Sequence, residues 1–205
     1  MKNYSHKDPN SEVPRSHPWT DGEAEPNYRY YDFKENRELI SEVLEDFIPF
    51  KSSPAIKTFY GLLHWLNGEE SRLESNDSVF RGPGPNSKKN FPKAMQCKGR
   101  LMILYRDLLL NTSLQHVETL EKGIRFFLNR IDHDFRWGVI GTTIMKVNYR
   151  ELATNGSDLP GYQLSLSFWS WGDTESELMA NLNRVFENMA ECLKRLNAEI
   201  VEAGM

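Results

Sequence analysis

Apolar and polar residues alternate strictly between Tyr162 and Phe168, and this pattern constrains the fold more than any other feature of the chain. A period of two residues places one set of side chains on each face of a β-strand. A second alternating segment occupies 139–149, and a cluster of turn residues at 154–158 separates the two segments. We therefore predict a long β-hairpin over 139–171.

The segments on either side of this hairpin show helical periodicity, with apolar residues three and four positions apart. Several also carry end signals. Ser53 before Pro54 is typical of a helix start, and the pairs Thr112/Gln115 and Thr174/Glu177 are capping-box patterns. The predicted helices are 33–48, 53–66, 113–131 and 174–200.

The remaining segments contribute little regular structure to this prediction. Residues 69–96 are predicted to be a long connection, because the prolines and glycines at 81–86 disfavour regular hydrogen-bond ladders. The apolar run at 101–105 is interpreted as a strand. The predicted fold class is α+β, with a small antiparallel-dominated sheet of about three strands, including the hairpin 139–171. Helices cover one face of this sheet, and two further helices lie at the N-terminal end.

The chain divides into two predicted regions. Residues 1–32 contain four prolines among charged and small polar residues, a composition that cannot bury enough apolar area to offset its ordering entropy. We interpret them as a flexible polar arm. Residues 33–205 suit a single α+β domain, since a typical domain has ~100–200 residues.

Composition excludes several classes of protein. The chain contains no apolar run of the ~20 residues that span a membrane and no signal-peptide core, so we expect a cytoplasmic location and no membrane partner. The net charge of −4 argues against general coating of nucleic acid. Cys97 and Cys192 lie far apart and outside any zinc-binding spacing, so no metal is predicted.

Positive charge concentrates in one stretch. No acidic residue occurs between Asp77 and Asp107, where seven lysines and arginines lie. Such a field can attract a nucleic acid or an acidic partner surface, or it can neutralise the acidic helices of the protein itself. Both alternatives stay open at this point. The seven residues are Arg81, Lys88, Lys89, Lys93, Lys98, Arg100 and Arg106.

No residue pattern defines a catalytic site. The chain lacks a nucleophile elbow, and Pro83 and Pro85 remove the backbone N–H donors that a phosphate-binding glycine loop needs. We assign no catalytic residue and no cofactor. The most reactive cluster is Asp132-His133-Asp134, but adjacent side chains diverge and cannot converge on one atom.

Aromatic residues supply the clearest functional signal. If Leu164, Leu166 and Phe168 face the helices, Trp169 and Trp171 stand on the opposite face of the sheet. Tryptophan is enriched among residues that dominate binding energy at interfaces. We therefore predict a cytoplasmic macromolecule-binding protein of inhibitor, immunity or adaptor type, and the absent catalytic patterns favour this over an enzyme. A protein partner is expected, with nucleic acid as a further partner through 81–106. The predicted partner-binding residues are Trp169, Trp171, Trp137, Arg81, Lys88, Lys89 and Lys93.

The alternative is an enzyme that acts on a phosphorylated or nucleic-acid substrate. In this hypothesis His133 is the acid or base, and Arg81, Lys88, Lys89 and Lys93 hold the anionic groups. It requires His133 to share one cleft with the basic residues.

Overall fold

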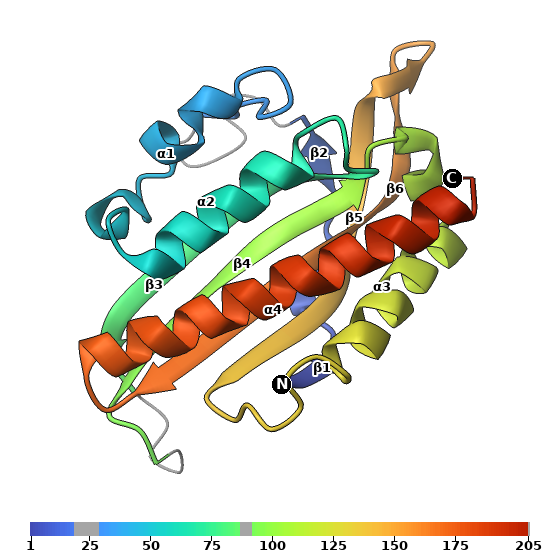
Figure 1. Ribbon diagram of the computed structural model, residues 1–205. Coiled ribbons are helices and arrows are strands. Elements are labelled where there is room, and N and C mark those ends of the chain that lie inside the picture. The colour runs from blue at the N-terminus through green and yellow to red at the C-terminus, as the bar shows by residue number, and fades with distance from the viewer. Residues whose placement is uncertain (19–28, 87–91, 205) are drawn as a thin grey trace.

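One mixed β-sheet forms the centre of the computed structural model, which describes residues 1–18, 29–86 and 92–204 (Figure 1). Its strand order is β1-β5-β6-β4-β3, and β2 also pairs with β5. The β1–β5 and β2–β5 pairs are parallel, and the others are antiparallel. The six strands are β1 (Lys2–Ser5), β2 (Arg15–His17), β3 (Leu73–Pro85), β4 (Met95–Tyr105), β5 (Gly138–Thr154) and β6 (Ser157–Gly172).

The predicted hairpin is present as β5 and β6. Its tip is a two-residue turn between the paired residues Thr154 and Ser157. Asn155 and Gly156 adopt positive φ values of 54° and 78°. A type I′ turn requires positive φ at both positions, and Asn-Gly is the preferred sequence because glycine has no Cβ and asparagine tolerates this region.

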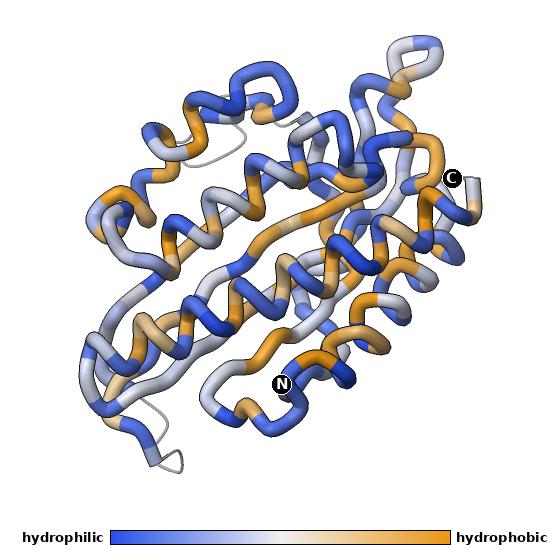
Figure 2. Tube along the Cα trace, in the orientation of Figure 1, coloured by the Kyte–Doolittle hydropathy of each residue, from blue (hydrophilic) through white to orange (hydrophobic). Residues whose placement is uncertain are grey.

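Three long helices cover one face of the sheet: α2 (Pro54–Leu66), α3 (Leu114–Leu128) and α4 (Glu175–Glu202) (Figure 1). Two begin as the sequence predicts, because Ser53 accepts a hydrogen bond from the Ile56 N–H and Thr174 accepts one from the Glu177 N–H. Hydrophobic and hydrophilic residues alternate along α4 in Figure 2, as expected of an amphipathic helix. None of the helices among the described residues is both long and apolar enough to cross a lipid bilayer.

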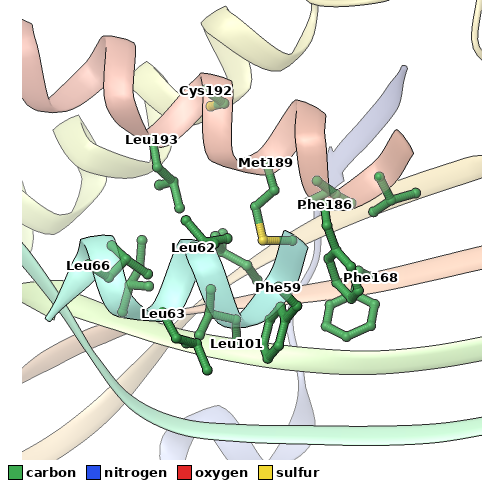
Figure 3. Close-up of a cluster of buried hydrophobic side chains, with 14 of the residues drawn as sticks. Phe59, Leu62, Leu63, Leu66, Leu101, Phe168, Phe186, Met189, Cys192 and Leu193 are labelled. Atoms are coloured by element: carbon green, nitrogen blue, oxygen red, sulfur yellow. The ribbon is translucent and has the colours of Figure 1, made fainter. Parts of the chain in front are cut away.

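The main hydrophobic core lies between these helices and the sheet (Figure 3). Phe59 of α2, Phe168 of β6 and Phe186 of α4 meet there. The Phe186 ring lies 4.8 Å from the Phe59 ring and 4.9 Å from the Phe168 ring, measured between centroids. All three side chains are fully buried. Apolar burial of this kind is the dominant stabilising contribution to folding.

The prediction of a small sheet of about three strands is wrong, although the α+β class is correct. The sheet has six strands, because β1, β2 and β3 add to β4 and the hairpin. β3 occupies part of 69–96, where the prolines and glycines predict a connection. It is an edge strand, where Pro83 and Pro85 need not donate to a neighbouring strand. β1 and β2 come from the segment interpreted as a polar arm, and residues 19–28 of that segment lie outside the described residues.

The predicted pair of N-terminal helices is also wrong, because only the second one forms. In place of a helix over 33–48 the chain has a four-residue helix, α1 (Ile40–Val43), flanked by the 3-10 turns η2 (Arg37–Leu39) and η3 (Ile48–Phe50). A helix ending at residue 48 would place Glu45 and Asp46 in its last turn. The helix dipole disfavours negative charge there.

The segment before α3 differs from its prediction as well. A 3-10 helix, η4 (Leu108–Thr112), lies between β4 and α3. The pair Thr112/Gln115 forms no capping box, because the Thr112 hydroxyl donates to the Leu109 carbonyl. Ser113 is the N-cap of α3 and makes no side-chain capping bond.

Candidate functional site

The side of the sheet opposite α2, α3 and α4, here called the outer face, carries the features closest to a binding site. As predicted, β6 directs Leu164, Leu166 and Phe168 into the core beneath the helices. The residues between them therefore point to the outer face. Trp169 is half-buried there, whereas Trp171 is only 5% exposed and is not available to a partner.

Strand register places a line of side chains across the outer face, here called the cationic row. Arg81 pairs with Lys98, Lys98 with Trp169, Trp169 with Val139, and Val139 with Lys2. The three cations are exposed at the surface. Because paired residues point to the same side of a sheet, five strands contribute one residue each to this row, with Trp169 near its middle.

A second row lies two residues further along the strands. It consists of Val79, Arg100, Ser167, Gly141 and Tyr4, again paired in this order. The Tyr4 ring stacks on Trp169, with centroids 6.1 Å apart and an angle of 28° between the planes. Gly141 lies beneath this pair, since a Cβ at its position would come within 3.1 Å of the Tyr4 ring and 3.3 Å of the Trp169 ring.

The cations of the two rows differ in their partners. Arg100 of the second row donates to Asp77 at 2.7 Å, and Arg15 lies 3.7 Å from the same carboxylate. Arg81, Lys98 and Lys2 of the cationic row form no ion pair and no side-chain hydrogen bond within the described part of the chain. Like charges directly opposite each other on neighbouring strands are destabilising, so the Arg81–Lys98 pair contributes nothing favourable to folding.

The described cations of the stretch 81–106 have different surroundings. Lys93 binds Asp173 at 2.8 Å and Glu177 at 2.5 Å, and its ammonium lies 4.6 Å from the centre of the half-buried Trp137 ring. This lysine therefore neutralises the acidic first turn of α4. Arg106 donates to the carbonyls of Leu66 and Gly68 at the end of α2. Lys88 and Lys89 lie outside the described residues.

The proposed acid or base, His133, lies in the exposed loop between α3 and β5. Its Nε2 is 3.2 Å from a carboxylate oxygen of Asp134, and both side chains are at least 75% exposed. No interaction among the described residues connects His133 with Arg81 or Lys93. The neighbouring Asp132 is engaged differently, because it forms a bidentate pair with Arg184.

A buried polar cluster lies on the outer face away from the cationic row, where β3 has a register shift at Asn76. Such a bulge changes the direction in which a side chain points. The Asn76 amide donates a hydrogen bond to Gln163 at 2.6 Å and lies 3.3 Å from Nδ1 of His17. The Nε2 atom of His17 is 3.9 Å from Glu74, which pairs with Lys34 at 3.1 Å. This cluster links β2, β3 and β6.

Burial controls the titration of this cluster. Desolvation and the nearby Lys34 ammonium lower the pKa of His17 to about 4, against a smaller opposing effect of Asp32. Burial raises the pKa of the Glu74 carboxyl, although Lys34 acts in the opposite direction. His17 is therefore neutral at physiological pH.

A cavity of about 390 Å³ adjoins this cluster. Tyr30 and Asn76 line it and also contact His17, so they separate the histidine from the cavity. Its other lining residues among those described are mostly aromatic, aliphatic or acidic, with Arg29 as a cation: Tyr31, Phe33, Glu42, Val43, Leu44, Glu45, Asp46, Phe47, Asp77 and Ser78.

Neither cysteine is placed for catalysis. Cys97 and Cys192 are free and buried, and burial raises the pKa of each thiol to about 12. A thiol in this environment is a poor nucleophile. Among the described residues, no three His, Cys, Asp or Glu side chains are grouped closely enough to hold a metal ion.

Comparisons of the chain with protein-family models, with curated proteins and with solved structures give no match. The arrangement of side chains on the outer face is therefore the basis for a functional interpretation.

Proposed function

We propose that this chain is a cytoplasmic macromolecule-binding protein whose outer sheet face docks an anionic partner. One observation carries the proposal: Arg81, Lys98 and Lys2 lie in line with Trp169, are exposed, and have no ion-pair partner among the described residues. Because folding gains nothing from this arrangement, an interaction outside the chain accounts for it best.

The distribution of charge supports this proposal. The chain has a net charge of −4, yet the accessible part of the outer face is cationic. A local field of opposite sign to the whole molecule orients an anionic partner before contact and raises its association rate. A protein of this kind acts as an inhibitor, an immunity protein or an adaptor according to the partner that it occupies. The two free cysteines are compatible with a reducing compartment such as the cytoplasm.

Affinity capture with face variants tests the proposal. The purified chain is immobilised, incubated with native lysate at low salt, and the bound protein and nucleic acid are quantified separately. We expect the combined variant Arg81→Gln/Lys98→Gln and the variant Trp169→Ser each to lose most of the captured material.

The matched control is Lys57→Gln, which removes one exposed positive charge from α2 on the helical side. It should capture as much as the unmodified chain. Equal capture by all variants would show that the outer face is not the binding surface.

A further inference from the structure

We infer that the anionic partner of the outer face is a single strand of nucleic acid. This inference rests on the proposed function and specifies the occupant of the same surface. Three features of the described residues carry it: two stacked aromatic rings that are partly exposed, cations on both sides of Trp169, and few aliphatic side chains in the two rows.

The aromatic rings are arranged for base stacking. Tyr4 is 41% exposed and Trp169 is half-buried, and their rings stack on each other above Gly141. A ring that is held in place on a rigid strand offers a flat π-surface at low entropic cost. Stacking of an unpaired base on such a ring tolerates any base, because every base has a π-face.

The cations flank the Trp169 ring along the line of the row. Arg81 and Lys98 lie on one side of Trp169, and Lys2 lies on the other side, beyond Val139. Neighbouring strands are ~4.8 Å apart, so the row extends over roughly 20 Å across the sheet. A single strand that follows the row would place phosphates against the cations and a base against Trp169.

The composition of the two rows argues against a protein partner. The residues beside Trp169 and Tyr4 include Ser167 and Gly141, and the only apolar aliphatic side chains in the two rows are Val79 and Val139. The centre of a protein interface is normally more apolar and is depleted of charge. In a duplex the base faces are covered by neighbouring base pairs, so the rings would have nothing to stack on. A single strand exposes both its base faces and its phosphates.

Fluorescence anisotropy with labelled oligonucleotides tests this inference on the full chain. The probes are oligodeoxythymidine and oligouridine of about 12 nucleotides, within the usual site size of a single-strand-binding domain. A duplex of the same length and poly-L-glutamate serve as competitors. We expect both single strands to bind at low salt and to be displaced poorly by the duplex and by polyglutamate. The two oligonucleotides distinguish DNA from RNA as the preferred strand.

Three variants and one control assign the binding to the cationic row. Trp169→Ala should weaken binding about 5- to 150-fold, and Trp169→Phe should retain most of the affinity because a ring remains. With three phosphate contacts, the slope of the logarithm of the association constant against the logarithm of the salt concentration should be about −2. Arg81→Gln removes one of these contacts and should reduce the magnitude of the slope by about 0.7. Lys57→Gln should leave both the affinity and the slope unchanged.

Several results would overturn the inference: no binding of either single strand at low salt, equal or tighter binding of the duplex, full competition by polyglutamate, or equal affinity of Trp169→Ala and the unmodified chain. A different result would contradict the proposed function: the face variants would capture as much macromolecule from lysate as the unmodified chain. If they lose a captured protein while no oligonucleotide binds, the outer face remains the binding surface and the occupant is an acidic protein.

Discussion

Arg81 and Lys98 occupy directly paired positions on β3 and β4 with no acidic residue bound to either among the described residues. We predict that Arg81→Gln or Lys98→Gln leaves the free energy of unfolding unchanged or raises it by about 0.2–1 kcal/mol, because the repulsion between like charges is removed. Urea denaturation measures this, with Lys57→Gln as the control for loss of one charge. A loss of more than about 1 kcal/mol would mean that these cations stabilise the fold.

His17 has no exposed surface, and its folded-state pKa of about 4 lies below the 6.5 of an unperturbed histidine. As the pH falls through 6.5, the unfolded chain binds a proton that the folded chain does not, so stability is lost between about pH 6.5 and pH 4. At pH 5 this one group should cost about 2 kcal/mol relative to neutral pH. The raised pKa of Glu74 acts in the opposite direction as the pH falls.

The variant His17→Gln separates these two effects, because it removes the titrating imidazole and keeps Glu74. Its free energy of unfolding should fall less between pH 7 and pH 5 than that of the unmodified chain, measured by urea denaturation at each pH. An equal fall in both proteins would assign the pH dependence to other groups.

The candidate site was partly predictable at the level of single residues. The alternation along β6 places Trp169 on the outer face, in agreement with the structure, and the gap in acidic residues distinguishes the stretch that contains Arg81. The sequence contains no signal that aligns Lys2, Lys98 and Arg81, since only the pairing of distant strands brings them into one row. Lys93 pairs with Asp173 and Glu177, which follow it by 80 and 84 positions, so the local charge pattern contains no signal of this pairing.

Neighbouring residues of β6 provide a direct test of the two faces of the sheet. Phe168 is fully buried beneath the helices, and Trp169 is half-buried on the outer face. We predict that Phe168→Ala lowers the free energy of unfolding by about 3–5 kcal/mol, through lost burial and a residual cavity. Trp169→Ser should cost clearly less, since part of its surface already contacts water. Thermal denaturation compares the two, and the reverse order would contradict the assignment of the faces.

Elements with strong local signals were predicted well, and those without such signals were missed. α2, α4 and the hairpin each combine periodicity with end signals inside one segment, such as Ser53 or Asn155-Gly156. β1, β2 and β3 are short or polar edge strands whose stability comes from pairing with β4 or β5. Pairing between distant segments produces little signal in the local composition, so the sequence of a polar strand predicts a loop.

The N-terminal residues complete the molecule by closing one edge of the sheet. β1 and β2 pair with β5 through Lys2–Ser5 and Arg15–His17, and the side chains of Met1 and His17 are buried. We predict that removal of residues 1–17 lowers the free energy of unfolding by at least about 1.5 kcal/mol, because burial of one methionine alone contributes ~1.5–3 kcal/mol. Calorimetry measures the loss, with the exposed substitution Arg15→Ala as the control. An unchanged melting temperature would show that the domain folds without these strands.

The parallel pairing of β1 with β5 also has a consequence for synthesis of the chain. Lys2 leaves the ribosome 137 residues before its partner Val139. At ~5–20 residues per second the wait is on the order of ten seconds. Throughout that interval Met1 and Tyr4 have no sheet to join, and they remain accessible to chaperones and proteases. In a nascent chain that stalls before β5, the segment Lys2–Ser5 therefore stays unpaired, even if the helices that precede β5 have already formed.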